Sequence, residues 1–176
     1  MAKAKNIDRI VQDGDPVLRQ VAIAVPKKDI GSPALQKVIK KMHAALAPEK
    51  YGVAIAAPQV GVSLRLFVVA GRVFKDEVPE GEEDTQPSPP NRVYINPEIT
   101  RASRKKLEES EGCLSVRSVY GTVIRHERVT LSYIDEHGKQ QTQNATGLLG
   151  HIFQHEVDHL NGILFIDKAR DLHESQ

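Results

Sequence analysis

Residues 148–160 of the chain read LLGHIFQHEVDHL, and the spacing of their side chains predicts a largely buried helix. The apolar residues recur three and four positions apart, which is the period of one helical face. They are Leu148, Leu149, Ile152, Phe153, Val157 and Leu160. Gly162 follows them, where a glycine commonly ends a helix. A helix with so broad an apolar face must be covered by other elements of the fold.

The same stretch contains a metal-binding pattern, His155-Glu156-Val157-Asp158-His159. Residues four apart lie one turn apart on one helical face, so His155 and His159 can bind one ion. Glu156 lies about 100° around the helix from His155 and can accept a proton from metal-bound water. This is the arrangement of a metallohydrolase. Two polar residues at the edge of a buried helix are the alternative, but burying imidazoles among apolar side chains without partners is costly.

A catalytic metal needs a third protein ligand and one open position. The downstream candidates lack the short spacing of a third zincin histidine; they are Asp167, Asp171, His173 and Glu174. Upstream, Cys113 stands in the sequence EGCLS, and a thiolate is a strong ligand for Zn²⁺ or Fe²⁺. Gly112 would allow the backbone to approach the site closely. Taken alone, a lone cysteine more often packs as a small apolar side chain.

The composition excludes several classes of protein. Hydrophobic residues make up 40% of the 176 residues, and the formal net charge is +1. This balance offers no basic surface for DNA and no charge for an acidic membrane. Cys113 is the only cysteine, so an internal disulfide is impossible and a cytoplasmic location is expected. No stretch approaches the roughly 18 apolar residues of a membrane span.

The rest of the chain indicates strands around the late helix. Apolar spacing predicts a helix over residues 33–46, capped by Ser32. Strands are predicted at 64–69, at 93–95 and twice within 119–133, with a turn at 135–138. The charged, proline-rich segment 75–92 is expected to be a surface loop. We therefore predict one α+β domain over residues 1–176, with antiparallel strands packed around the central C-terminal metal-binding helix and the N-terminal helix outside.

Three separate segments resemble the signature motifs of the peptide deformylase family, in the family's order. They are GVAIAAPQ at 52–59, EGCLS at 111–115 and QHEVDHL at 154–160. The resemblance extends from about residue 7 to 168, and three motifs together are far more specific than one. It implies that the chain is a hydrolase that removes the formyl group from the amino terminus of newly made polypeptides.

By this resemblance, Cys113, His155 and His159 bind the metal. Glu156 acts first as general base on the metal-bound water and then as general acid toward the departing amine. The side chain of Gln59 and the backbone N–H of Leu114 stabilise the oxyanion that forms when hydroxide attacks the formyl carbon. The residues implied to contact the substrate, mainly as a paired strand, are Gly52, Val53, Ala54, Ile55 and Gly112. From composition alone, residues 52–56 are an ordinary buried strand.

One thiolate and two imidazoles suit both Zn²⁺ and Fe²⁺. The resemblance favours Fe²⁺ as the physiological metal, with Zn²⁺ or Ni²⁺ as substitutes. Its implied partners are N-formylmethionyl nascent peptides and, transiently, the ribosome. Two alternatives remain open from the residues: a zinc endopeptidase, and a structural or redox-sensing metal site in which Glu156 is dispensable.

Several positions bear on how this chain differs from the family pattern. Ala54 stands where a second glycine is usual, Arg117 replaces a common proline, and Tyr120 stands where many bacterial members carry a charged residue. Contacts with substrate residues beyond methionine are therefore expected to differ. Arg125 matches a family arginine. It is predicted to pair with Glu111 and stiffen the ligand loop, the alternative being a rim ion pair of little consequence. The C-terminal tail is too short for the long final helix of many bacterial members.

Overall fold

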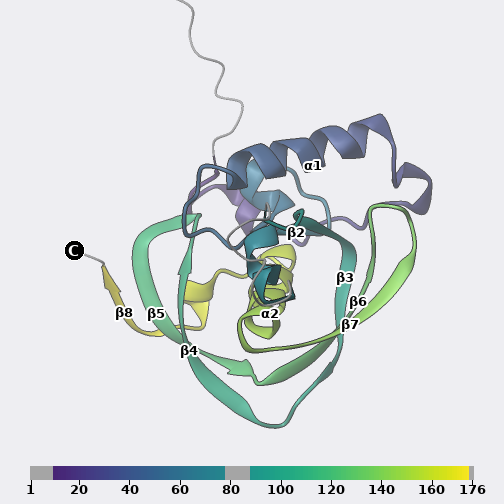
Figure 1. Ribbon diagram of the computed structural model, residues 1–176. Coiled ribbons are helices and arrows are strands. Elements are labelled where there is room, and N and C mark those ends of the chain that lie inside the picture. Colours follow the sequence, from purple (N-terminus) through teal and green to yellow (C-terminus); the bar gives the residue numbers. More distant parts are fainter. Residues whose placement is uncertain (1–9, 78–87, 175–176) are drawn as a thin grey trace, which may run out of the picture.

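The computed structural model describes residues 10–77 and 88–174 and has the predicted α+β architecture (Figure 1). The helices are α1 (Pro33–Leu46) and α2 (Gly147–Leu160). Short 3-10 turns are η1 (Pro16–Arg19), η2 (Lys27–Asp29), η3 (Ala57–Val60), η4 (Gly71–Glu77) and η5 (Phe165–Asp167). The strands are β1 (Ala54–Ala56), β2 (Leu66–Val69), β3 (Arg92–Ala102), β4 (Lys106–Cys113), β5 (Val116–His126), β6 (Arg128–Ile134), β7 (Gln140–Thr146) and β8 (Arg170–Glu174). None of the helices in these residues is long and apolar enough to cross a membrane.

Within residues 10–77 and 88–174, the named strands form two antiparallel sheets. The larger has the order β1-β2-β3-β6-β7 and the smaller the order β4-β5-β8. Helix α2 lies between them and contacts β1, β3, β6 and β7 of the larger sheet and β5 of the smaller. Helix α1 lies outside this arrangement (Figure 1). The prediction of antiparallel strands around a central C-terminal helix is thus confirmed.

The larger sheet separates two apolar cores, because successive side chains of a strand point to opposite faces. The core beneath α1 includes Leu35, Ile39, Met42, Ile55 and Val68. The core around α2 includes Phe67, Tyr94, Leu131, Phe153 and Leu160. The rings of Phe67 and Tyr94 stack with centroids 4.8 Å apart, and Phe153 meets Tyr94 edge-on at 5.1 Å. These ring contacts hold α2, and with it the metal-binding pattern, against the sheet.

Local sequence sets where the two helices begin and end. The hydroxyl of Ser32 accepts a hydrogen bond from the Leu35 N–H at 3.2 Å, which caps α1 as predicted. After α2, the Gly162 N–H donates to the His159 carbonyl at 3.1 Å, and Gly162 has a φ of 75°. A Cβ at Gly162 would lie 2.6 Å from the carbonyl oxygen of Arg19. Both the left-handed conformation and the close approach therefore require glycine.

Two segments add detail to the sequence predictions. Of the predicted loop at 75–92, residues 78–87 lie outside the described part of the chain. The preceding residues belong to η4, which continues to Glu77, and β3 begins at Arg92. The short C-terminal tail forms the edge strand β8 beside β5. The tail was too polar to show a strand period, and its pairing depends on an edge that another part of the chain provides.

Candidate active site

The predicted metal ligands come together from two elements. Cys113 ends β4, whereas His155 and His159 lie one turn apart on α2. The sulfur of Cys113 is 3.2 Å from Nε2 of His159, and one ligand atom from each of the three residues lies within 4.8 Å of the others. Tetrahedral ligands at bond lengths of about 2.0–2.3 Å are roughly 3.5 Å apart. The set therefore fits one divalent ion in both spacing and donor type.

The surroundings of these ligands favour a thiolate at Cys113 and a protonated imidazole at His155. Burial raises the pKa of the Cys113 thiol, but His159 and His155 outweigh burial and hold that pKa well below its ordinary value. Burial lowers the pKa of His155, but Cys113 and Glu111 raise it well above its ordinary value. Because a metal binds the thiolate and the neutral imidazole, it would take the place of the proton on His155.

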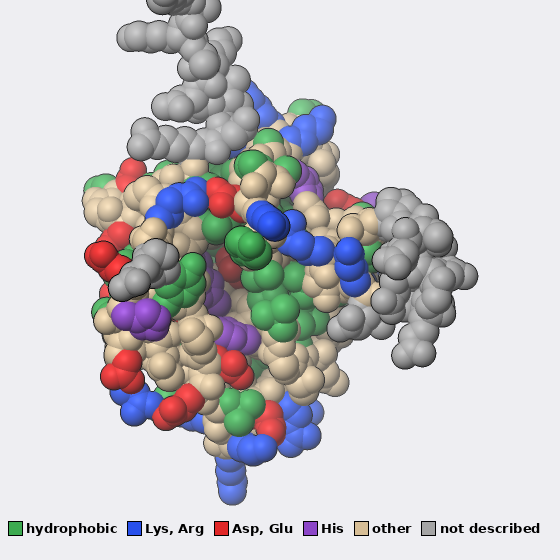
Figure 2. All heavy atoms as spheres, turned by 60° about the vertical axis from the view of Figure 1, so that its left-hand side comes forward, with side chains coloured by type: hydrophobic (Ala, Val, Ile, Leu, Met, Phe, Trp, Pro, Cys, Tyr) green, Lys and Arg blue, Asp and Glu red, His purple; other side chains and the backbone are tan. Residues whose placement is uncertain are grey.

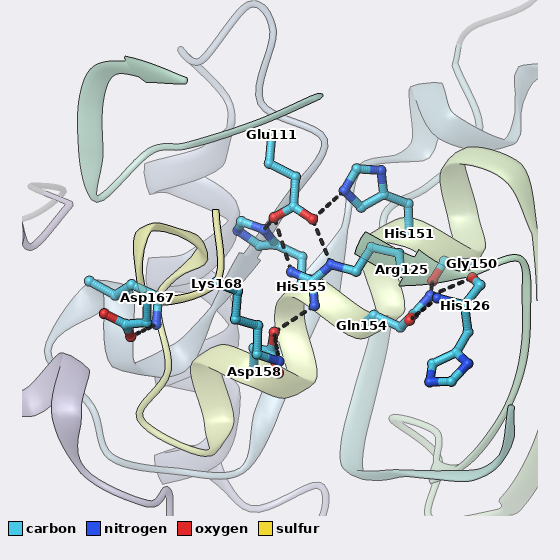
Figure 3. A network of polar contacts seen from close by, with 11 residues as sticks. Glu111, Arg125, His126, Gly150, His151, Gln154, His155, Asp158, Asp167 and Lys168 are labelled. Carbon is cyan, nitrogen blue, oxygen red and sulfur yellow. Dashed lines mark hydrogen bonds and ion pairs between the residues drawn. The ribbon is translucent and has the colours of Figure 1, made fainter. Parts of the chain in front are cut away.

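A buried carboxylate orients His155 (Figure 3). Glu111 accepts hydrogen bonds from Nδ1 of His155 at 2.8 Å and from Nε2 of His151 at 2.6 Å. It also forms a two-point ion pair with the guanidinium of Arg125 at 2.6 and 3.0 Å, which confirms the predicted pairing. Burial raises the pKa of Glu111, but His151, His155 and Arg125 together hold it well below its ordinary value. The charged carboxylate thus leaves Nε2 of His155 as the ligand nitrogen.

This network continues toward the surface through Asp158, as Figure 3 shows. Arg125, which is 4% exposed, donates from Nη1 to Asp158 at 2.6 Å. Asp158 in turn accepts from Lys168 at 2.8 Å. The amino-acid sequence alone did not indicate that His151 pairs with Glu111 or that Asp158 pairs with Arg125. No local signal indicates either pairing, because the partners on β4, β5 and α2 meet only when the helix packs against the smaller sheet.

Glu156 lies beside the ligands and is 4% exposed. Its Oε2 is buried without a hydrogen-bond partner among the described residues. Burial raises the pKa of this carboxyl group. Because a carboxylate of raised pKa is a stronger base, Glu156 is suited to accepting a proton from water at this point.

Gln59 is fixed with its amide nitrogen toward the ligands. Its side-chain oxygen accepts from the Ala56 N–H at 2.9 Å. Its nitrogen consequently faces Cys113, 3.6 Å from the sulfur, and donates to the hydroxyl of Ser115 at 3.1 Å. A buried N–H donor is therefore held next to the metal position, with its orientation set by a local turn.

A cleft of about 710 Å³ opens onto these groups. Residues 49–54, which end in the first residue of β1, form one wall, and β4 with the start of β5 forms the other. The floor includes Leu148 and Ile152 of α2. Figure 2 shows apolar side chains beside histidines in this hollow. Leu148 is 55% exposed, so it faces the cleft and not the core that its helical period suggested.

The predicted substrate-contacting residues divide into two groups. Gly52, Val53, Ala54 and Gly112 line the cleft. Ile55 does not, because its side chain points to the opposite face of β1 and is fully buried in the core beneath α1. A Cβ at Gly112 would lie 2.7 Å from a ring carbon of Tyr120, so a larger residue there would displace this partly exposed ring. Besides the expected close approach of the backbone to the site, the position of the Tyr120 ring thus favours a glycine here.

The wall at β1 offers a strand edge. Among the described residues, β1 pairs on one side only, with β2. The Val53 carbonyl accepts from the Ala70 N–H at 2.8 Å on that side. Since hydrogen-bonding directions alternate along a strand, the backbone groups of Ala54 are directed to the other edge, toward the cleft. An extended peptide can add there as a further strand.

Comparison with known proteins places this geometry in a family. The model of the polypeptide deformylase family matches residues 7–175. The chain belongs to this family. Its members are metal-dependent hydrolases that remove N-formyl groups from nascent peptides. The peptide deformylase of Prochlorococcus marinus is 40% identical over 163 residues, which cover 93% of this chain and 73% of the relative. Peptide deformylase 2 of a Nostoc species is 41% identical over 160 residues, covering 91% and 84%.

Solved structures of the family share the fold. A class I type b peptide deformylase from Acinetobacter baumannii, bound to Met-Ala-Ser, matches with a TM-score of 0.78 and 36% identity over 92% of this chain and 97% of that one. A peptide deformylase from Synechococcus elongatus in complex with actinonin matches with a TM-score of 0.77 and 36% identity over 97% and 83%. The predicted family, fold and hydrolase activity are confirmed, and the endopeptidase and purely structural alternatives fall away.

Proposed function

We propose that this chain deformylates peptides with a metal held by Cys113, His155 and His159 and with Glu156 as the proton carrier. One observation carries the proposal. The Cys113 thiol, whose pKa is lowered, and the imidazoles of His155 and His159 converge on one point. Beside this point lies the buried carboxyl group of Glu156, one oxygen of which has no hydrogen-bond partner among the described residues. The cleft leads to this point. Such a set of residues has the ligands and the base that hydrolysis requires.

A bound divalent metal would supply a lowered pKa for the attacking water and polarisation of the formyl oxygen. Glu156 would accept a proton from that water and then donate it to the amine of the departing peptide, so that formate is released. The Gln59 amide and the backbone N–H of Leu114 would stabilise the negative charge that develops on the formyl oxygen. Glu111 would keep His155 in the orientation that ligation needs.

The peptide would lie as an added strand along the free edge of β1, paired with Ala54. Val53, Leu148 and Ile152 line the cleft beside this edge and offer an apolar surface for the methionine side chain. Ala54, which replaces the usual glycine, is 7% exposed as a whole residue, and its methyl group packs into the core around α2. This departure therefore leaves the backbone edge accessible.

Fe²⁺ is the proposed physiological metal, with Zn²⁺ or Ni²⁺ as substitutes, because a thiolate with two imidazoles suits these ions. A ferrous site with a thiolate would be sensitive to oxygen. The proposed substrates are N-formylmethionyl nascent peptides, which makes a cytoplasmic location and a transient contact with the ribosome part of the same proposal. The unit that acts is proposed to be one domain over residues 1–176.

The test is formate release from formyl-Met-Ala-Ser by protein loaded anaerobically with Fe²⁺, Zn²⁺ or Ni²⁺. Glu156→Ala should lower turnover by about 10²- to 10⁴-fold while metal content stays unchanged. Glu108→Ala is a matched control, because Glu108 lies in an exposed pair with Arg170 outside the cleft. Full activity of the Glu156 variant, or cleavage of casein without formate release, would contradict the proposal.

A further inference from the structure

An ion pair joins the two walls of the cleft. Arg117, near the start of β5, donates from Nη2 to Oε1 of Glu49 at 2.6 Å and from Nη1 to Oε2 at 3.3 Å. Both residues line the cleft, and Glu49 lies just before the segment that leads into β1. The pair is therefore part of the surface along which a peptide would extend once its formyl end is at the metal ligands.

The segment from Glu49 to Gly52, which forms one wall of the cleft, is also held in place by contacts other than this ion pair. Arg72 donates to the carbonyl of Glu49 at 2.8 Å and also to the carbonyl of Gly52. The Gly52 N–H donates to the Glu49 carbonyl at 3.0 Å, which closes the turn. Because these bonds fix the backbone independently, the Glu49 side chain can exchange its partner without loss of the wall.

The guanidinium is available to a competing carboxylate. The side chain of Arg117 is 53% exposed and that of Glu49 is 22% exposed. Exposed ion pairs are weak, so a carboxylate held nearby by a bound peptide can replace Glu49. Arginine recognises a carboxylate through two parallel hydrogen bonds, as Glu49 already demonstrates here. Lys50 adds a second positive charge to the same rim, and Figure 2 shows basic side chains along the edge of the hollow.

We propose that Arg117 is a specificity-determining residue, which favours N-formylmethionyl peptides with an acidic side chain at the second or third position. Glu49 competes with that side chain for the guanidinium and limits the preference. A basic side chain at the same position is disfavoured by Arg117 and Lys50, since like charges oppose each other. This inference rests on the proposed function, because it concerns the substrate of the same site.

The experiment compares kcat and KM of the metal-loaded protein for formyl-Met-Ala-Ser and for peptides with Asp or Lys at the second or third position. The wild type should prefer the acidic peptide about three- to fivefold in kcat/KM, mainly through KM, as expected for an exposed ion pair. Arg117→Glu should invert this ratio. Glu49→Gln should increase it, because the competitor for Arg117 is lost.

Arg170→Glu is the matched control. Arg170 forms an exposed pair with Glu108 at 2.5 Å, and neither residue lines the cleft. This variant has the same change in net charge as Arg117→Glu and should keep the wild-type ratio. If it shifts the ratio as much as Arg117→Glu does, the preference comes from overall charge and the proposal is overturned.

Other results also overturn it. The proposal is overturned if the wild type has equal kcat/KM for acidic and basic peptides at both positions. It is also overturned if Arg117→Glu lowers kcat equally for both peptides, since the ion pair would then only stabilise the shape of the cleft. If Arg117→Glu does not fold, Glu49→Gln decides, and an unchanged ratio there refutes the idea. Absence of formate release from formyl-Met-Ala-Ser by the wild type would refute the proposed function itself.

Discussion

Glu111→Gln tests whether the buried carboxylate organises the metal site. The change keeps the shape of the side chain and removes its charge. In the structure this carboxylate accepts hydrogen bonds from three side chains, His151, His155 and Arg125. After the change, Arg125 retains Asp158 as its ionic partner, but the hydrogen bonds that hold His155 lose their charged acceptor.

The magnitude follows from burial. The side chains of Arg125 and Glu111 are 4% and 2% exposed. Breaking a buried pair by removing one partner costs about 3–5 kcal/mol. Since Asp158 still faces Arg125, we expect the lower end of that range, about 3 kcal/mol. With a urea m-value of about 2 kcal/mol/M, the midpoint of unfolding should fall by about 1.5 M. Metal affinity should fall by about 10- to 100-fold, because the orienting partner of a ligand is lost.

Urea unfolding of the metal-free protein measures the first effect, and competition with a chromogenic chelator measures the second. Glu108→Gln is the control, because it makes the same substitution on the same strand in an exposed pair with Arg170. It should change the free energy of unfolding by at most about 1 kcal/mol. If Glu111→Gln lowers stability by no more than this control and binds metal as the wild type does, the reasoning is refuted.

Three further changes test other parts of the structure. The side chain of Gln141 and backbone N–H groups of the turn lower the pKa of Asp135. Asp135→Ala removes these hydrogen bonds and, because the turn is exposed to solvent, should destabilise the protein by at most about 1 kcal/mol at pH 7. Since the folded pKa lies below the unfolded value, the difference in urea stability should be present above about pH 4 and vanish as the pH falls through the folded pKa; a pH-independent difference would argue against it. Gly162→Ala should lower Tm by several degrees, because a Cβ would lie 2.6 Å from the Arg19 carbonyl and φ is 75°; an unchanged Tm in calorimetry would be inconsistent with this. Removal of metal with a chelator should lower Tm, and re-added Zn²⁺ should restore it in a concentration-dependent manner, whereas a metal-independent Tm would speak against a site formed by folding.

Local sequence was sufficient for the elements that carry the site. The apolar period over 148–160 placed α2, and the four-residue spacing put His155 and His159 on one face. Ser32 and Gly162 marked helix ends correctly, because capping depends on residues adjacent in the chain. The choice of Cys113 as the third ligand did not follow from spacing. It came from the resemblance of three motifs to a known family.

Tertiary structure decided which side chains meet. The apolar period of the helix predicted that Leu148 lies in the core, yet this side chain faces the cleft. The sequence pattern also gave no indication that Glu111 pairs with His151 or that Arg117 pairs with Glu49. The physical reason is that spacing along one element determines which residues share a face. What that face touches depends on strands and helices distant in sequence, whose burial and register are set by the packing of the whole chain.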